Sequence, residues 1–384
     1  MSSAKTYGSE LNALEIQDFL DYAIKQNSNI SKDSGKRGTP VCVWGTHGLG
    51  KTESIIDFAR RNDYTYVYCA PAQFEELGDL HGIPETYDPT PEMPNSGDEY
   101  TVYRPPQWLH SALSNADPKK PGLLILDDFN RAEPRILQGC MQLLQMHALF
   151  SWELPPNWQI VLTANPEGGD YDVNEMDDAM LTRMLHITMR FDAECWAKWA
   201  INKGLDNRGI EFLLTYPQTV NGIRTTARSF TQFIMQISPL KNMDDEKNLR
   251  LIEIIGKGTL EDETINKFMH FCKFVKRKLL SPTEILEAKD FKKDIAIRIK
   301  QVVSGDGYKR TDLLNTMCSN LCLYLSSDRY KYNEKHKENF IQFCMHPDML
   351  GSMQFKVHHL LSQTEETKPL LRDARFANVV LNAM

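Results

Sequence analysis

The stretch VCVWGTHGLGKTES, residues 41–54, carries the first group of residues that could do chemistry. Gly45, four further residues and then Gly50, Lys51 and Thr52 fit the spacing G-x-x-x-x-G-K-[ST]. Glycines let such a loop turn its N–H groups toward an anion, and the N-terminus of a following helix favours the same charge. We therefore expect a loop that binds the phosphates of ATP, with Lys51 on the β and γ phosphates and Thr52 on Mg²⁺. The expected nucleotide-binding residues are Gly45, Thr46, His47, Gly48, Leu49, Gly50, Lys51 and Thr52.

A second group follows the apolar run LLIL, residues 123–126, where Asp127 and Asp128 stand side by side. Four consecutive apolar residues are typical of a buried strand. Carboxylates at the carboxyl end of a parallel strand lie at the edge where such sheets bind ligands. Because a phosphate-binding loop of this kind shares its Mg²⁺ between a hydroxyl and such a carboxylate, we expect Asp127 to be a metal ligand beside Thr52.

The elements that must position these residues alternate between strand and helix. Strands are expected at 40–44, 64–70, 123–126, 158–164 and 184–190, and helices at 11–26, 51–61 and 134–146. This alternation predicts an α/β fold with a parallel sheet that helices cover on both faces. Polar residues 27–38 are expected to form a loop. The segment 82–106, rich in proline and acidic residues, is expected to be an inserted hairpin, after which a helix resumes at 106–115.

Strand signals fade beyond about residue 205, and helical patterns continue from there. Helices are expected at 208–216, 227–237, 245–256 and 262–280, and Ser281-Pro282 is a start signal for another. We expect three regions: an α/β nucleotide-binding core at 1–205, a helical lid domain at 206–280 and a C-terminal helical region at 281–384.

The composition is that of an ordinary globular protein of 384 residues, with 41% hydrophobic and 25% charged residues. A net charge of -7 argues against a general nucleic-acid binder. The N-terminal stretch MSSAKTYGSEL has no signal-peptide core and no apolar run reaches membrane-span length, so we expect a cytoplasmic protein without membrane contact. The eight cysteines follow no zinc pattern and are expected to be buried free thiols.

The residues after the acid pair resemble a known family. DDFNRAEPRILQGCMQLLQ, followed by WQIVLTANPEGGDYDVNEMDDAMLTRMLHITM, is similar to the MoxR group of AAA+ ATPases. Members of that group commonly read D-E-[IF]-N-R-A, then a strand ending in A-x-N-P, then a helix ending in L-x-x-R-F. LGDLHGIPE, YRPPQWL and TTARSFTQF also resemble it, so the resemblance covers about residues 38–235. It implies a P-loop AAA+ core, a hairpin inserted within the second helix and a helical lid.

The resemblance also implies roles for matching residues. Asn165 is similar to the sensor 1 residue that holds the attacking water or the γ-phosphate, although Asn-Pro is also a turn signal by itself. Arg183 resembles the arginine finger, which acts on the ATP of the next subunit. Arg228 resembles the sensor 2 arginine that couples the lid to nucleotide, with Arg224 as the alternative. Arg131 stays unassigned.

A finger supplied in trans requires head-to-tail contacts between copies, and such contacts close into rings. We therefore expect a hexamer with ATP at each interface. The resemblance implies a chaperone-like role, in which hydrolysis remodels a partner protein, often one with a von Willebrand factor A domain. The acidic tip at 85–99 is interpreted as a solvated loop in preference to a docking site for that partner.

Two alternatives stay open: an ATP-gated assembly scaffold with little turnover, and a DNA-directed AAA+ loader. The acidic balance of the chain disfavours the second of these. A GTPase is disfavoured because the sequence has no N-K-x-D segment to read guanine.

Asp128 departs from the family pattern and generates the first prediction. Where the group has a glutamate that orients and polarises the attacking water, this chain has an aspartate, whose reach is about 1.5 Å shorter. Since a misplacement near 1 Å can cost about a hundredfold in rate, we predict slow but real ATP hydrolysis. In a phosphate-release assay, Asp128→Glu should hydrolyse ATP at the same rate or faster, and Asp128→Asn should be inactive. Strong turnover by Asp128→Asn would remove Asp128 from the mechanism.

Overall fold

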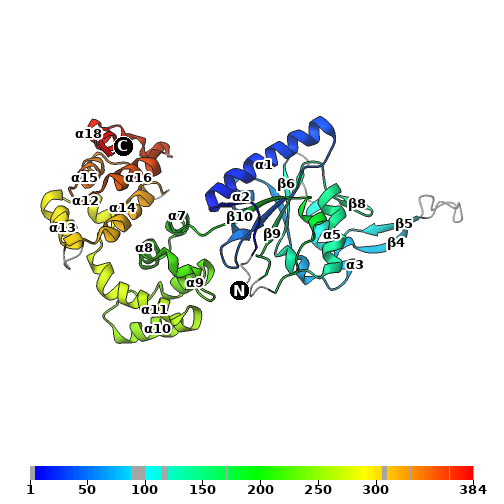
Figure 1. The fold of residues 1–384 in the computed structure, drawn as a ribbon, viewed down its shortest axis with the longest axis horizontal. Helices are drawn as coiled ribbons and strands as arrows, with labels where there is room; N and C mark the ends of the chain where they lie inside the picture. Colours follow the sequence, from blue (N-terminus) through cyan, green and yellow to red (C-terminus); the bar gives the residue numbers. More distant parts are fainter. Residues whose placement is uncertain are drawn as a thin grey trace. The chain divides into compact units, whose positions relative to one another are not determined.

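The computed structural model describes residues 5–87, 100–114, 117, 120–168, 172–304, 309–327, 330–362 and 364–383. The chain divides between Phe191 and Asp192 into two compact units, the first mixed α/β and the second helical (Figure 1). This boundary lies earlier than the one expected after residue 205, because helix α7 (Ala193–Lys203) packs on α8 (Asn207–Thr215) and α14 (Thr311–Leu325) of the second unit. The subdivision of the helical part at residue 280 stays a prediction.

The first unit contains all the strands of the described chain, and each strand and helix expected for it is present. Its strands are β1 (Ser9–Leu11), β2 (Val41–Trp44), β3 (Thr65–Cys69), β4 (Ile83–Tyr87), β5 (Tyr100–Arg104), β6 (Gly122–Leu126), β7 (Ala148–Leu149), β8 (Trp152–Glu153), β9 (Trp158–Ala164) and β10 (Leu185–Met189). Its α-helices are α1 (Ala13–Ser34), α2 (Lys51–Arg61), α3 (Leu77–His81), α4 (Gln107–Ser114), α5 (Pro134–Met146) and α6 (Asp178–Leu181), with 3-10 turns at Pro71–Gln73 and Phe129–Arg131.

Six strands form one sheet in the order β1-β10-β2-β9-β6-β3, and every neighbouring pair is parallel. The carboxyl ends of β2, β6 and β9 therefore meet at one edge, since Trp44 pairs with Ala164 and Leu126 with Leu162. The predicted α/β class with a parallel sheet is confirmed.

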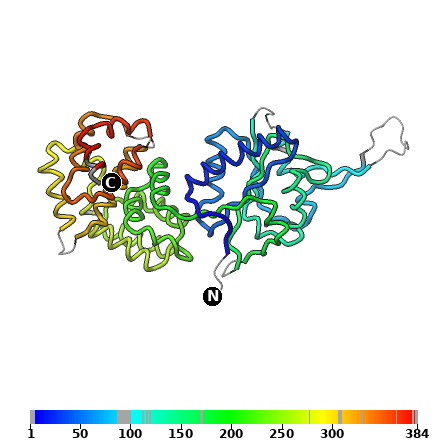
Figure 2. The backbone as a smooth tube through the Cα atoms, turned by 45° about the horizontal axis from the view of Figure 1, so that its top comes forward, coloured from blue at the N-terminus to red at the C-terminus, as the bar shows by residue number. Residues whose placement is uncertain are grey.

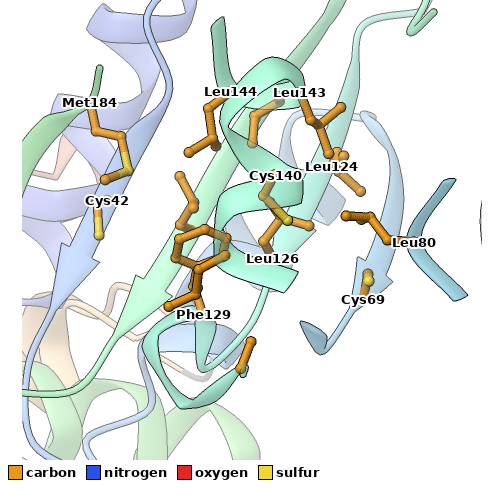
Figure 3. Close-up of a cluster of buried hydrophobic side chains, with 14 of the residues drawn as sticks. Cys42, Cys69, Leu80, Leu124, Leu126, Phe129, Cys140, Leu143, Leu144 and Met184 are labelled. Atoms are coloured by element: carbon orange, nitrogen blue, oxygen red, sulfur yellow. The ribbon is translucent and has the colours of Figure 1, made fainter. Parts of the chain in front are cut away.

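Both faces of the sheet are covered, because alternate residues of a strand point to opposite sides. Val41 and Val43 join a buried cluster with residues of α1 and α2, whereas Cys42 and Trp44 join a second cluster with residues of α3 and α5. Figure 1 shows α1 and α2 on one face and α5 on the other. Figure 3 shows part of the second cluster, where Cys140, Leu143 and Leu144 of α5 pack over the sheet.

Helix α1 is longer than expected, because residues 27–34 continue it although their composition predicts a loop. Asn12 and Glu15 form a capping box at its start. In its second half, Asn27 is buried and exchanges two hydrogen bonds with the backbone of Thr39, with Nδ2 donating at 2.9 Å and Oδ1 accepting at 3.1 Å. The helix stops at Gly35, whose φ of 67° is left-handed.

The expected insert is an antiparallel hairpin of β4 and β5, which projects from the first unit (Figure 2). Residues 88–99, most of the acidic tip, lie outside the described residues. A second, smaller hairpin of β7 and β8 has no counterpart among the sequence-based expectations. It braces the insert, since Tyr103 N–H donates to Ser151 Oγ at 2.9 Å and the rings of Tyr103 and Phe150 stack at 4.6 Å.

The second unit is helical throughout its described residues, as expected. Its remaining α-helices are α9 (Ala227–Ile237), α10 (Glu246–Thr259), α11 (Asp262–His270), α12 (Pro282–Glu287), α13 (Ile297–Ser304), α15 (Glu334–Cys344), α16 (Gly351–Ser362), α17 (Lys368–Leu371) and α18 (Ala374–Ala383). Ser281 caps α12, in agreement with its start signal. Phe212, Phe230, Phe268 and Phe271 form a buried aromatic cluster in this unit.

Two further expectations concern the whole chain. All eight cysteines are free, and all but the half-buried Cys195 are buried, as predicted. Within the described residues, no helix has the length and apolar character needed to cross a membrane.

His147 generates a prediction about stability. It caps α5 in a left-handed conformation with a φ of 53°, is fully buried, and its Nε2 faces the carbonyl of Gly38 at 3.1 Å. Burial, with a contribution from nearby Arg37, lowers the pKa of His147 from 6.5 to about 4. The stability that depends on its neutral ring is therefore complete above pH 6.5 and is lost as the pH falls toward 4, by about 3 kcal/mol at most.

The variant His147→Asn keeps a residue that tolerates the left-handed backbone but removes the titrating ring. Urea unfolding at a series of pH values should show the wild type losing stability relative to this variant between pH 6.5 and 4. Parallel stability curves for the two proteins would contradict the assignment.

Candidate functional site

The loop between β2 and α2 is the first part of the candidate site. Gly45, Gly48 and Gly50 have φ values of 151°, 73° and 91°, a region that residues with a side chain rarely adopt. Gly50 is the N-cap of α2, and no side chain caps this helix end. A Cβ at Gly50 would meet nothing within 4 Å, so its φ rather than crowding requires a glycine. The uncapped N-terminus of α2 therefore faces a loop whose backbone is turned by glycines, as an anion-binding loop requires.

Lys51, the first residue of α2, places its ammonium group inside this loop. Its side chain is 6% exposed, and Nζ donates to the carbonyls of Gly45 at 2.7 Å and Thr46 at 3.1 Å. It also donates to Oδ1 of Asn165 at 3.2 Å. The structure thus brings together the expected phosphate-binding lysine and the expected sensor residue from β9.

Asp127 accepts hydrogen bonds from three hydroxyl groups on three different elements. Thr52 Oγ1 of α2 and Thr163 Oγ1 of β9 both donate to its Oδ1, at 2.5 and 2.6 Å, and Tyr68 OH of β3 donates to its Oδ2 at 2.9 Å. Desolvation, and the hydrogen bond and charge of Asp127, raise the pKa of Tyr68 to about 12, so the phenol keeps the proton that it donates. The predicted pairing of Thr52 with Asp127 is present.

Asp128 is held in a left-handed conformation, with a φ of 49°. Its backbone N–H donates to Thr163 Oγ1 at 2.8 Å, and Asn165 Nδ2 donates to its Oδ1 at 2.9 Å. Arg131 Nε lies 3.6 Å from its Oδ2. A continuous chain of hydrogen bonds therefore runs from Lys51 through the Asn165 carboxamide to the Asp128 carboxylate.

Asn130 fixes the backbone of Asn165. Its side chain is fully buried, with Nδ2 donating to the Asn165 carbonyl at 2.8 Å and Oδ1 accepting from the Asn165 N–H at 3.0 Å. Sequence reasoning missed Asn130, Thr163 and Tyr68 as site residues. Thr163 stands two residues before Asn165 and so shares its side of the strand, and Asn130 follows the acid pair directly after Phe129. No signal in the sequence marks Tyr68.

Arg183 does not reach this site in its own chain. It lies between α6 and β10, two residues before Leu185, which pairs with Val41 at the amino end of β2. The glycine loop follows the carboxyl end of β2, at the opposite edge of the sheet. The Arg183 guanidinium instead donates to Gln145 Oε1 at 3.3 Å and to the Ala179 carbonyl.

The two candidates for the sensor 2 role both lie in the second unit. Arg224 is tied to its own unit, with its guanidinium donating to the Lys257 carbonyl at 3.0 Å and its backbone N–H to Glu261 Oε1 at 2.7 Å. Arg228 is exposed on the second residue of α9. Both arginines are exposed, and they differ in that the Arg224 guanidinium is hydrogen-bonded to another helix of its own unit.

The donor set suits a nucleoside triphosphate with Mg²⁺. The glycine loop and Lys51 offer N–H donors and positive charge, and Thr52 with Asp127 offers a hydroxyl and a carboxylate, the oxygen ligands that Mg²⁺ takes. The described residues contain no group of three His, Cys, Asp or Glu side chains that could hold a metal ion by themselves. A metal at this site would accordingly complete its coordination with phosphate oxygens and water.

Comparison with known proteins adds little to this geometry. No protein-family model matches the chain, and no curated protein matches it. Among solved structures, the chain is similar to a mutant of RuvB from Thermotoga maritima, with a TM-score of 0.37 and 11% identity over 72% of this chain and 78% of that one.

Thr163 generates a prediction for metal binding. Thr163→Val keeps the shape of the buried side chain but removes the hydroxyl that orients Asp127 and accepts from the Asp128 N–H. Leaving these groups unpaired should weaken Mg²⁺-dependent ATP binding about tenfold. Titration of a fluorescent ATP analogue with and without Mg²⁺ measures the effect. Thr65→Val, at the amino end of β3 and so away from the site, is the control and should bind as the wild type. Equal affinities for both variants would contradict the role of Thr163.

Proposed function

We propose that this chain is an AAA+ ATPase of the MoxR type, which hydrolyses Mg-ATP at the subunit interfaces of a homo-hexameric ring. The observation that carries the proposal is one hydrogen-bonded network that joins Lys51 and Thr52 to Asp127, Asp128 and Asn165. These residues come from α2, the end of β6 and the end of β9, which are separate in the sequence. Their convergence at the carboxyl edge of a parallel sheet is the arrangement that phosphoryl transfer needs.

In this proposal, the loop at 45–52 holds the phosphates through its backbone N–H groups, and Lys51 balances their negative charge. Thr52 and Asp127 hold Mg²⁺, and Tyr68 and Thr163 keep the Asp127 carboxylate oriented toward it. Bound Mg²⁺ supplies positive charge that stabilises the phosphate oxygens as the terminal bond breaks.

Asp128 and Asn165 act on the attacking water. Asp128 orients the water through its carboxylate, and Asn165 fixes that carboxylate by donating to its Oδ1. Because Asn165 Oδ1 also accepts from Lys51, both the oxygen and the nitrogen of its carboxamide are hydrogen-bonded before substrate binds. Asn130 keeps the Asn165 backbone in place.

Arg183 completes the site of a neighbouring subunit in this proposal. The position of Arg183 at the amino edge of the sheet supports a role outside its own site. Arg228 couples the helical unit to nucleotide, and this assignment is preferred because the guanidinium of Arg224 is already hydrogen-bonded to the Lys257 carbonyl within that unit. Hydrolysis would then remodel a bound partner protein, for which a protein with a von Willebrand factor A domain is the proposed candidate.

A second candidate function is an ATP-gated scaffold that assembles on binding ATP and turns over little. It is favoured by the shorter reach of Asp128 and by the engagement of its carboxylate with Asn165 at 2.9 Å and Arg131 at 3.6 Å. Both candidates share the nucleotide site and differ in the rate of hydrolysis.

Phosphate release by single variants and their mixture tests the proposal. Lys51→Ala should abolish ATP binding and hydrolysis, and Arg183→Ala should bind ATP but lose at least about a hundredfold in rate. Mixed in equal amounts, the two should recover about a quarter of the wild-type rate, since a subunit with an intact loop then meets a neighbour with an intact Arg183 at that fraction of interfaces. Wild-type release no faster than that of Lys51→Ala would favour the scaffold, and a mixture without recovery would reject the role of Arg183 in trans.

A further inference from the structure

Glu167 is a buried acidic residue that the proposed reaction leaves unexplained. It stands two residues after Asn165 and is only 4% exposed. Its Oε1 accepts from the Met176 backbone N–H at 2.9 Å, and its Oε2 accepts from Tyr7 OH at 2.8 Å. Its backbone also pairs with Lys5, through hydrogen bonds of 2.8 and 2.9 Å. A carboxylate is costly to bury, so a position that only filled space would be served better by an apolar side chain.

The contact with Met176 joins the end of β9 to the segment that leads to Arg183. That segment is also bound to the turn after Asp127 and Asp128, because Asn174 donates from its backbone N–H to the Asn130 carbonyl and from Nδ2 to the Ala132 carbonyl, both at 2.8 Å. Met176 is followed directly by Asp177, the N-cap of the short helix α6. The backbone N–H of Arg183 then donates to the Met180 carbonyl at 3.1 Å. Arg183 therefore follows a short helix, and the segment that leads into this helix is connected by hydrogen bonds to the candidate site.

The contact with Tyr7 provides a second connection to the same helix. The Tyr7 ring packs on Trp44, the residue before Gly45, with ring centroids 4.8 Å apart. Trp44 Nε1 donates to His186 Nδ1 at 2.9 Å, so the proton of that imidazole is on Nε2, which donates to the Leu181 carbonyl at 2.8 Å. Leu181 is the last residue of α6. Both ends of α6 are thus connected through hydrogen bonds and ring packing to Glu167.

We propose that Glu167 is a positioning residue that fixes where the turn after α6 presents Arg183 to the neighbouring subunit. This inference rests on the proposed function, because it gives Glu167 a role only where Arg183 acts in trans. In this proposal, Glu167 contacts neither the phosphates nor the attacking water of its own site. Its loss should accordingly impair the subunit that donates Arg183 and spare the subunit that holds ATP.

Mixtures of two inactive variants distinguish an effect on the subunit that donates Arg183 from an effect on the subunit that holds ATP. The finger donor carries Lys51→Ala, the ATP holder carries Arg183→Ala, and their mixture without further changes is the reference for phosphate release. Glu167→Ala is then added either to the donor or to the holder. We expect the addition to the donor to lower the recovered rate about tenfold or more, because a misplacement near 1 Å is enough for such a loss. The addition to the holder should leave the recovered rate within about twofold.

Glu167→Gln is the matched control, since an amide can still accept from the Met176 N–H and contact the Tyr7 hydroxyl. It should retain most of the recovered rate in either subunit. If Glu167→Ala does not fold, as judged by its circular dichroism and thermal transition, Tyr7→Phe in the donor replaces it and should lower the rate about threefold.

Equal losses from both placements, or a loss only in the holder, would overturn the proposal and assign Glu167 to the support of Asn165 in its own site. No loss from either placement would also overturn it. A reference mixture that recovers no activity would instead reject the proposed function, so the two failures are distinguishable.

Discussion

The burial of the Lys51 ammonium group is the constraint on which the rest of the site depends. A charged amine that is 6% exposed is stable only with acceptors arranged around it, and Gly45, Thr46 and Asn165 supply oxygens at 2.7 to 3.2 Å. Two of these oxygens belong to the glycine loop and the third to the end of β9. The conformation of the loop and the placement of Asn165 are therefore set together. Everything that Asn165 touches, including Asp128, follows from the same requirement.

The strand order places the nucleotide site and Arg183 at opposite edges of the sheet. Because β2 lies between β9 and β10 in a parallel sheet, the loop, the acid pair and Asn165 gather at the carboxyl edge. Arg183 precedes β10 and so lies at the amino edge of the same sheet. In the proposed function, this separation allows one subunit to hold a nucleotide while it presents an arginine to its neighbour. A site formed entirely within one chain would not use Arg183, because Arg183 lies at the other edge of the sheet.

The hydroxyl groups around Asp127 and the amides around Asn165 show a second feature of the site. Buried polar groups are stable when every donor and acceptor is matched, and Thr163 and Asn130 provide that matching from β9 and from the turn after β6. Such a network keeps its members in one arrangement in the absence of ligand. Chemistry that depends on charge stabilisation benefits from this, because little reorganisation is then needed on binding.

The sequence by itself predicted most of the elements and singled out the residues that the structure joins around the glycine loop. Its apolar runs correctly predict β2, β3, β6, β9 and β10, and its glycine spacing marks where α2 begins, because local periodicity and turn chemistry act over a few residues. Sequence patterns over a few residues did not predict two elements of the first unit. Polar residues 27–34 continue α1, where Asn27 is buried and hydrogen-bonded to Thr39, and the hairpin of β7 and β8 is too short to give a periodic pattern.

Only the tertiary structure decided which side chains meet. Tyr68 reaches Asp127 because β3 pairs with β6, and nothing in either segment specifies that pairing. Glu167 reaches both Tyr7 and Met176, so a contact across 160 residues of chain and one across nine depend on the same buried carboxylate. The register of a sheet arises from the packing of its whole core, and a motif read along the chain carries no record of it.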